Sequence, residues 1–376
     1  MNEIPVLIWH VGAGKTGTTS IQQTLSVNQS ALFSQGVKYL GYMLEGTQVQ
    51  KFSWQQPAEL EVFHRLSEQE TAEALETIFQ EEVRHARSRG VHTLIWSNES
   101  FYGRSEKVLR VLLKFEGKYF RLKIVAYVRS YEKWAKSAYI QWGIEHKTYN
   151  GKIRSFEEWF SGQNYSFYES FLPIIEQCPD KFTLRNMEHI DDVVLDFLKI
   201  CSIELEGLQI FRVYESPKNL EIYFRSIFNN QFEEIVRPEK FDFLIGNSIR
   251  VGTSPASYLR SLLPDSEGAE KISRSFSIDR EKLNKFLLSK GEAPVKKDTV
   301  YVEEIKIDRD TLIGCLAEIV MHQEVTIQSL NYKLIELSRK IINPNDSVKK
   351  NIFSRILSSF KKRFSNFISK GCNLNQ

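Results

Sequence analysis

Residues 6–25 carry the strongest indication of how the chain folds, and they read Val-Leu-Ile-Trp-His-Val-Gly-Ala-Gly-Lys-Thr-Gly-Thr-Thr-Ser-Ile-Gln-Gln-Thr-Leu. The apolar run at 6–9 is typical of a buried parallel strand, and residues 21–25 are typical of the start of a helix. Three glycines, one lysine and three threonines lie between the two segments. Glycine allows the tight turn that points successive backbone N–H groups into one concavity at a helix N-terminus, where anions bind. The stretch therefore predicts a phosphate-binding loop.

The loop matches two widespread nucleotide-binding motifs only in part. A Walker A loop is spelled Gly-x-x-x-x-Gly-Lys-Ser/Thr, which would put its first glycine at Trp9, inside the strand. The dinucleotide-binding fingerprint Gly-x-Gly-x-x-Gly is present as Gly12, Gly14 and Gly17. It also needs an acidic residue about 20 positions later, at the end of a second strand. The strand-like segment 36–41 has no acid at its end, so the fingerprint alone is weak evidence.

A second polar site is indicated where another buried strand ends. Residues 122–128 form an apolar run, Arg129 follows it directly, and Ser137 lies on the helix expected over 131–144. An arginine at the carboxyl end of a strand offers a planar fork of donors to phosphate oxygens. A serine about two turns into the next helix faces back toward the same edge. The alternative is that Arg129 is a surface ion-pair partner and Ser137 a solvated helix residue.

Taken together, the order Lys15-Thr16-Gly17-Thr18-Thr19 and the pair Arg129 and Ser137 resemble the two signatures of the sulfotransferases that use 3′-phosphoadenylyl sulfate (PAPS). The spelling around the first motif is similar to the bacterial branch of that family and to enzymes that modify glycans. The resemblance covers about residues 5–200 and weakens to about 290. It implies a sulfotransferase-like fold, PAPS as co-substrate and adenosine 3′,5′-bisphosphate as product, with no metal required.

The resemblance assigns a role to each residue of the two motifs. The loop would hold the 5′-phosphosulfate, Arg129 and Ser137 would hold the 3′-phosphate, and Lys15 would stabilise the leaving oxygen. The cofactor-binding residues expected on this basis are Gly14, Lys15, Thr16, Gly17, Thr18, Thr19, Ser20, Arg129 and Ser137.

A base for the acceptor hydroxyl is the remaining requirement. Cytosolic members of the family carry a histidine in the loop after the strand that precedes the arginine strand. Here that loop contains Asn98 and Glu99, and several glycan-modifying members use a glutamate, so we expect Glu99 to be the base. The alternatives are that Glu99 caps the next helix or pairs with Arg129. His10, at the end of the first strand, is the second candidate, although a histidine there can also serve to orient the loop. The expected catalytic residues are thus Glu99, Lys15 and His10.

The chain departs from the family in the residues expected to contact the adenine and the 3′-phosphate. Ser20 stands where cytosolic members have a tryptophan that stacks on adenine, and the tyrosine expected near 186–188 is missing. The basic segment that completes the 3′-phosphate site has no clear counterpart, and Arg185, Arg250 and Arg274 are candidates to replace it. The loops at 41–66, 145–170 and 230–290 contain no motif that identifies the acceptor.

The rest of the chain predicts an α/β fold. A capping box at Ser67 and Glu70 begins a polar helix that Gly90 ends, and further strands and helices alternate to residue 200. Such alternation predicts a P-loop-like parallel β-sheet covered by helices on both faces, with a C-terminal helical appendage. The expected parts are a catalytic domain at 1–300, a long helix at 305–342 and a basic amphipathic tail helix at 346–371.

Composition is that of a globular enzyme in a reducing compartment. The 376 residues are 42% hydrophobic, enough for a large core. The four cysteines are widely spaced and suggest neither disulfides nor a zinc site. Because the first strand begins at about residue 6 and no apolar run is long enough to cross a bilayer, we expect a cytoplasmic protein.

Two features near the C-terminus indicate partners. Apolar residues step by three and four along one helix, which predicts a coiled-coil seam and a homodimer through residues 313–341. A single helix docked on the domain is equally consistent with the pattern. The seam residues are Ile313, Leu316, Val320, Gln323, Ile327, Leu330, Leu334, Leu337 and Ile341.

The segment 347–370 contains seven basic residues and no acidic one, while the whole chain has a net charge of only +3. Its apolar residues fall on one helical face, which predicts binding to an anionic membrane surface on the inner face of the membrane. Packing of that face on the catalytic domain is the alternative, and the apolar stripe argues against nucleic acid as a partner.

Two classes of function remain open from the sequence. The first is a PAPS-dependent sulfotransferase acting on a hydroxyl of a carbohydrate or lipid-linked acceptor. The second is a nucleotide-binding P-loop kinase, or a module that binds a nucleotide without catalysis. A kinase would need a metal-binding aspartate at the end of a strand, and the sequence offers no obvious one.

Overall fold

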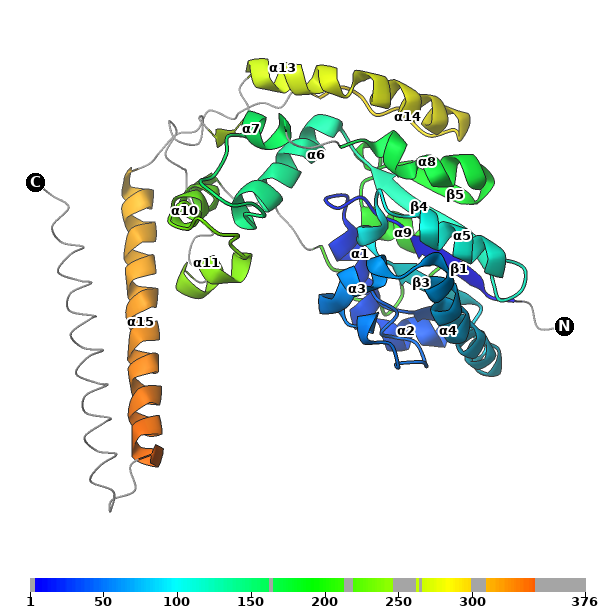
Figure 1. The fold of residues 1–376 in the computed structure, drawn as a ribbon, viewed down its shortest axis with the longest axis horizontal. Coiled ribbons are helices and arrows are strands. Elements are labelled where there is room, and N and C mark those ends of the chain that lie inside the picture. The colour runs from blue at the N-terminus through cyan, green and yellow to red at the C-terminus, as the bar shows by residue number, and fades with distance from the viewer. Residues whose placement is uncertain are drawn as a thin grey trace, which may run out of the picture. The chain divides into compact units, whose positions relative to one another are not determined.

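The computed structural model describes residues 4–161, 165–212, 219–245, 262–263, 266–298 and 309–341. The chain divides into two compact units, one made of Met1–Pro238 and Thr253–Ile307 and the other of Glu239–Gly252 and Asp308–Gln376. The first unit contains the sheet and the helices that cover it (Figure 1). The expected tail helix at 346–371 lies outside the described residues.

Five strands form one parallel sheet in the order β2-β3-β1-β4-β5. The strands are β1 (Val6–His10), β2 (Val37–Tyr39), β3 (Thr93–Ser97), β4 (Arg121–Val128) and β5 (Phe182–Asn186). The central strand β1 pairs with β3 on one side, where His10 stands opposite Ser97, and with β4 on the other, where His10 stands opposite Val125. The predicted parallel α/β architecture is therefore confirmed.

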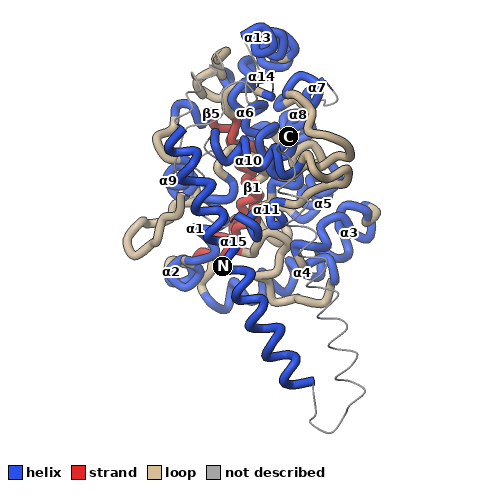
Figure 2. The backbone as a smooth tube through the Cα atoms, turned by 90° about the vertical axis from the view of Figure 1, so that its left-hand side faces the viewer, coloured by secondary structure: helices blue, strands red, loops and turns tan. Residues whose placement is uncertain are grey.

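Helices cover both faces of this sheet, as Figure 2 shows. Alternate residues of β1 pack into different cores: Leu7 and Trp9 into one, Ile8 into the other. On the Ile8 side lie α1 (Thr18–Val27), α2 (Gln29–Ser34) and α9 (Val193–Ile200). The Trp9 side is covered by α3 (Leu60–Arg65), α4 (Glu68–Arg89), α5 (Glu106–Phe115), α6 (Tyr131–Ala138) and α8 (Phe167–Gln177).

Local signals predicted most of these elements. Ser67 caps α4 through the amide of Glu70 in the expected capping box, and Gly90 ends the helix with a left-handed φ of 71°. The helix expected over 131–144 differs in its second half, because α6 ends at Ala138 and continues as a π-helix over Tyr139–Glu145. Gly143 permits this turn, since a Cβ there would lie 2.5 Å from the Tyr139 ring.

The other helices of the first unit lie around this framework. They are α7 (Phe156–Ser161), α10 (Asn219–Asn229), α13 (Ser266–Ser275) and α14 (Ser277–Ser289). The π-helix packs against α6, α7 and α10, and α14 packs against α8 and β5. The segments that end each strand and carry the polar motifs are thus supported by packed helices.

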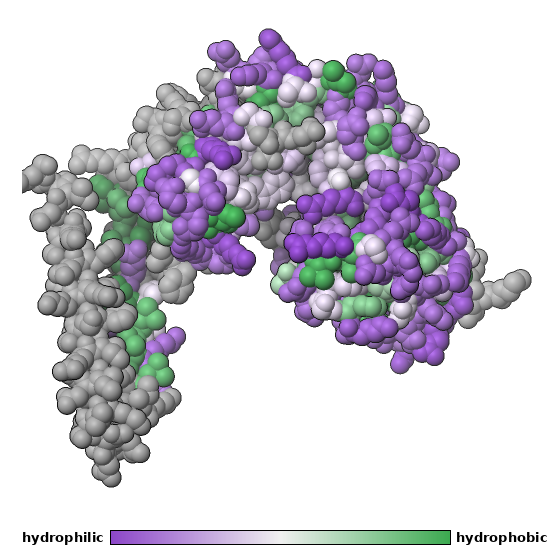
Figure 3. Space-filling view, in the orientation of Figure 1, coloured by the Kyte–Doolittle hydropathy of each residue, from purple (hydrophilic) through white to green (hydrophobic). Residues whose placement is uncertain are grey.

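The second unit contains most of α11 (Pro238–Ile245) and the long helix α15 (Arg309–Ile341). Apolar side chains gather along α15 in Figure 3. Six seam residues of this helix are between 44% and 63% exposed, namely Ile313, Leu316, Val320, Leu330, Leu334 and Leu337. A dimer through this seam stays a prediction. Among the described residues, none of the helices combines the length and the apolar character needed to span a bilayer.

Candidate functional site

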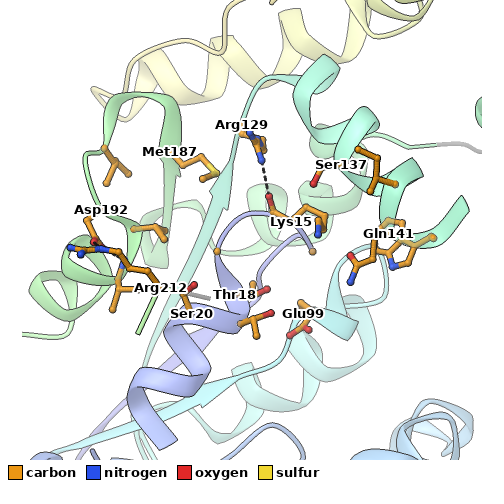
Figure 4. A pocket seen from close by; sticks show the side chains of 18 of the residues that line it. Lys15, Thr18, Ser20, Glu99, Arg129, Ser137, Gln141, Met187, Asp192 and Arg212 are labelled. Carbon is orange, nitrogen blue, oxygen red and sulfur yellow. Dashed lines mark hydrogen bonds and ion pairs between the residues drawn. The ribbon is translucent and has the colours of Figure 1, made fainter. Parts of the chain in front are cut away.

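A cavity of about 440 Å³ lies at the carboxyl edge of the sheet, where the loops after β1, β3, β4 and β5 meet. Ligands of open parallel sheets bind at this edge. Figure 4 shows the loop after β1 between Arg129 and Ser137 on one side and Glu99 on the other. The cavity is lined by Gly14, Lys15, Gly17, Thr18, Thr19, Ser20, Glu99, Arg129, Ser137, Ile140, Gln141, Trp142, Glu145, Met187, Ile190, Asp191, Asp192, Val193, Val194 and Arg212.

The loop after β1 turns sharply into helix α1. Gly17 has a φ of 86° and Lys15 a φ of 68°, a left-handed conformation that is costly for a lysine. A Cβ on Gly17 would lie 2.4 Å from Cγ1 of Val193, so only glycine fits against α9. Helix α1 then begins at Thr18 with neither a side-chain cap nor an acidic residue in its first turn. The helix N-terminus is therefore left to interact with an anion.

Hydrogen bonds hold the shape of this loop. The hydroxyl of Thr16 donates to the carbonyl oxygen of Ala13 at 2.6 Å, and Thr16 is buried and does not line the cavity. Trp134 Nε1 donates to the carbonyl oxygen of Gly14 at 2.9 Å. Of the seven loop residues expected to bind the cofactor, six line the cavity, and Thr16 instead stabilises the turn.

Arg129 extends from the end of β4 into the cavity, with 23% of its side chain exposed. Its Nη1 donates to the carbonyl oxygen of Lys15 at 3.3 Å, while its buried Nε has no hydrogen-bond partner. Glu188 lies 3.7 Å from Nε, too far to satisfy it. Burial lowers the pKa of this guanidinium, and the nearby carboxylates of Glu188 and Asp298 oppose that shift. A buried, incompletely paired guanidinium suits an anionic ligand, and Ser137 on α6 lines the same cavity.

Lys15 is the second cation of the site. Burial lowers the pKa of its ammonium group, Glu145 raises it and Arg129 lowers it further. Two desolvated cations next to an uncapped helix N-terminus form an environment that favours a ligand with more than one negative charge.

Glu99 lies in a short 3₁₀ turn after β3 and lines the cavity. Gln22 Nε2 on α1 donates to its Oε2 at 2.6 Å. Within the described part of the chain, the Glu99 carboxylate forms no ion pair, with Arg129 or with any other residue. The turn is capped by Asn98, whose Oδ1 accepts from the amide of Ser100. In the structure, Glu99 therefore neither caps a helix with its side chain nor pairs with Arg129.

His10 is fully buried and does not line the cavity. Its Nδ1 forms a hydrogen bond of 2.7 Å with the hydroxyl of Ser97, which joins β1 to β3, and its ring packs against Tyr127 and Phe197. Burial lowers the pKa of His10 from 6.5 to about 3, so the ring is neutral near pH 7. The position of His10 is better suited to orienting the loop than to exchanging protons with a ligand.

Other residues line the cavity that the motifs did not point to. Gln141, Trp142 and Glu145 come from the π-helix, an irregularity that is frequent at functional sites but has no simple sequence signature. Met187 and Ile190 come from the loop after β5. The sequence already puts residues 186–188 after a strand-like run, and so at this edge of the sheet, but it does not point to Ile190. The other lining residues that follow β5 in the chain are Asp191, Asp192, Val193, Val194 and Arg212.

Two of the arginines considered for completing the second phosphate site, Arg185 and Arg274, do not line the cavity. Arg185 bonds both Asp196, at 2.6 Å, and Glu292, so each of its three nitrogens has an acceptor. Arg274 is exposed and pairs with Glu270, and Arg250 lies outside the described residues. Arg212, which pairs with Asp192 at 2.6 Å, is the additional arginine of the lining.

A comparison of the chain with protein-family models gives no match, and neither does a comparison with curated proteins. Among the described residues, no group of three or more histidine, cysteine, aspartate or glutamate side chains is placed to hold a metal ion.

We predict that Gly17→Ala weakens anion binding at the loop more than Gly117→Ala weakens it. Both glycines have a left-handed φ, of 86° and 77°, but a Cβ on Gly117 has nothing within 4 Å. The Gly117 variant therefore measures backbone strain alone, about 1 kcal/mol, whereas the Gly17 variant must also displace Val193. Calorimetric titration with inorganic pyrophosphate and thermal unfolding of both variants provide the comparison. Equal binding by the two variants would contradict the role given to this turn.

Burial of neutral His10 predicts a loss of stability in acid. The unfolded chain takes up a proton below pH 6.5, whereas folded His10 does so only near pH 3. Stability therefore falls as the pH drops through this window, by about 1.4 kcal/mol per pH unit from this residue. In His10→Asn this contribution is absent, so denaturant unfolding between pH 7 and pH 5 should show a shallower decline than in the wild-type chain. Parallel declines would show that His10 is protonated in the folded state.

Proposed function

We propose that the protein is a sulfotransferase that moves a sulfuryl group from PAPS to a hydroxyl of a carbohydrate or glycolipid acceptor. One observation carries the proposal: the loop from Lys15 to Ser20, the pair Arg129 and Ser137, and the carboxylate of Glu99 all line one cavity. The parallel sheet with a phosphate-type loop after its central strand is compatible with the fold of that family.

The chemistry of the lining fits a nucleotide with two anionic ends. The uncapped N-terminus of α1 and Lys15 would hold the 5′-phosphosulfate, and Arg129 with Ser137 would hold the 3′-phosphate. The buried Arg129 Nε, which lacks a partner, would gain an acceptor in the 3′-phosphate. A cavity of about 440 Å³ also falls within the usual range for small-molecule sites, about 300–1,000 Å³.

An adenine ring needs an apolar surface, which the wall after β5 provides. Met187, Ile190 and Val193 line the cavity there. These side chains would replace the tyrosine and tryptophan contacts that the sequence lacks. The acidic Asp191 on the same wall offers an acceptor for an amino group, whereas Asp192 already accepts from Arg212 and from the first amides of α9.

Each catalytic side chain has one task in the proposed transfer. Glu99 removes the proton from the acceptor hydroxyl, whose oxygen forms the new bond to sulfur. The bond between that sulfur and the bridging phosphate oxygen breaks, and Lys15 stabilises the negative charge left on this oxygen. The proton ends on Glu99, and adenosine 3′,5′-bisphosphate leaves.

We predict tight binding of adenosine 3′,5′-bisphosphate and weaker binding of ATP, NAD and GTP, measured by isothermal titration. Arg129→Gln removes a charge-assisted donor worth about 1.5–3 kcal/mol, so the affinity should fall about 10- to 100-fold. Arg274→Gln is the matched control, because that arginine is exposed and lies outside the cavity. Preferential, magnesium-dependent binding of ATP or GTP would instead support the kinase alternative, and equal affinities of the two variants would exclude Arg129 from the site.

Transfer itself tests the catalytic roles. Sulfation of a panel of methyl glycosides and lipid extracts with ³⁵S-labelled PAPS should fall about 10²- to 10⁴-fold in Glu99→Gln, since a general base is lost. The affinity for adenosine 3′,5′-bisphosphate should change little in this variant. Lys15→Ala should lose both transfer and affinity. Near-wild-type turnover in both variants would refute the mechanism.

A further inference from the structure

The Glu99 carboxylate is held by one side chain from a distant part of the sequence. Gln22 Nε2 donates to Glu99 Oε2 at 2.6 Å and to the carbonyl oxygen of Ser97 at 3.3 Å. Both partners can only accept hydrogen bonds, so the amide nitrogen of Gln22 must face them. Within the described residues, Gln22 is the one side chain that hydrogen-bonds this carboxylate.

The backbone beneath Glu99 is already fixed by other contacts. His10 bonds the Ser97 hydroxyl at 2.7 Å, and the buried Asn98 donates from Nδ2 to the carbonyl oxygen of Tyr42 at 2.8 Å. Ser100 is held through its hydroxyl by His64 at 3.2 Å. With the main chain constrained on both sides, the rotation of the Glu99 side chain is the remaining freedom, and the bond from Gln22 restricts it.

Gln22 also links the two reacting sides of the site. It lies four residues after Thr18 on α1, so both residues share a face of that helix. The N-terminus of α1 faces the part of the cavity assigned to the phosphosulfate, and its second turn holds Glu99. A single rigid helix thereby sets the distance between the donor group and the base.

We propose that Gln22 is a positioning residue that orients Glu99 for proton removal. The inference rests on the proposed function, in which Glu99 is the base. A bond of this kind restricts the carboxylate to one rotamer and leaves Oε1 for the acceptor hydroxyl, which is the preorganisation that general-base catalysis requires.

The test uses variants of closely similar shape in the full-length chain. Gln22→Met keeps the size of the side chain but removes the donor, and Gln22→Glu replaces the donor with a second carboxylate. Gln23→Met is the matched control, because Gln23 is the next residue of the same helix but forms no hydrogen bond with Glu99. We expect release of ³⁵S-sulfate from PAPS to water to fall about 10- to 100-fold in Gln22→Met, further in Gln22→Glu and little in Gln23→Met. The affinity for adenosine 3′,5′-bisphosphate should stay within about twofold in Gln22→Met.

Two further measurements separate positioning from a merely structural role. Sulfuryl transfer from p-nitrophenyl sulfate to adenosine 3′,5′-bisphosphate needs no proton transfer, because the departing phenolate is stable. This reaction should persist in both Gln22→Met and Glu99→Gln. In the Glu99→Gln background, Gln22→Met should have no further effect on release to water, because residues that act as a unit are not additive.

The outcomes distinguish the two proposals. If Glu99→Gln leaves release to water unchanged, the role of Glu99 in the proposed function fails, and the inference fails with it. If Glu99→Gln abolishes release but Gln22→Met does not slow it, or if the two effects multiply in the double variant, Gln22 does not act through Glu99. Loss of the p-nitrophenyl reaction in Gln22→Met would show a general structural defect and would also overturn the inference.

Discussion

The parallel pairing of β1 with both β3 and β4 is the constraint on which the rest of the site depends. Because all three strands run in the same direction, their carboxyl ends open onto one edge of the sheet. The phosphate-type loop follows β1, Glu99 follows β3, and Arg129 follows β4. Segments that are far apart along the chain therefore meet around one cavity, because each of them directly follows the end of its strand. A loop transplanted to another edge would lie near neither Glu99 nor Arg129.

Burial of positive charge is the second constraint. Lys15 and Arg129 are partly removed from water, which lowers the pKa of each, and the nearby carboxylates compensate only in part. Arg185 on the neighbouring strand offers the contrast, because Asp196 and Glu292 provide an acceptor for each of its three nitrogens. An arginine whose nitrogens all have acceptors within the protein has little left to offer a ligand, whereas one with an unpaired buried nitrogen favours the binding of an anion. Arginines associated with the adjacent strands β4 and β5 thus differ in their availability to a ligand, because their hydrogen-bond partners differ.

Burial separates the two candidate bases in a similar way. His10 is enclosed by Tyr127 and Phe197, is neutral near pH 7, and links β1 to β3 through Ser97. Glu99 lies one strand away and reaches the cavity. The histidine is better described as part of the support for the loop that carries Glu99, together with Asn98 and Gln22. The site therefore consists of residues that face the cavity and a surrounding layer that holds them in place.

Most of the sheet and the loop that carries Lys15 could be predicted from the sequence. Apolar runs, glycines and a capping box determine the conformation of the few residues around them. Their effect can therefore be predicted without knowing the fold. The sequence also placed Arg129 and Glu99 at strand ends. It could not show that Thr16 points inward, that the helix after Arg129 changes into a π-helix, or that Met187 and Ile190 complete the cavity.

Those features arise only when elements distant in the sequence pack together. Val193 leaves no room for a side chain at Gly17, and Gln22 holds the carboxylate of Glu99. The positions of Glu188 and Lys15 leave Arg129 incompletely paired. Local sequence determined which polar groups stand at the end of each strand. Tertiary packing decided which of them are satisfied by the protein and which face the cavity, because hydrogen bonding and desolvation depend on neighbours from elsewhere in the chain.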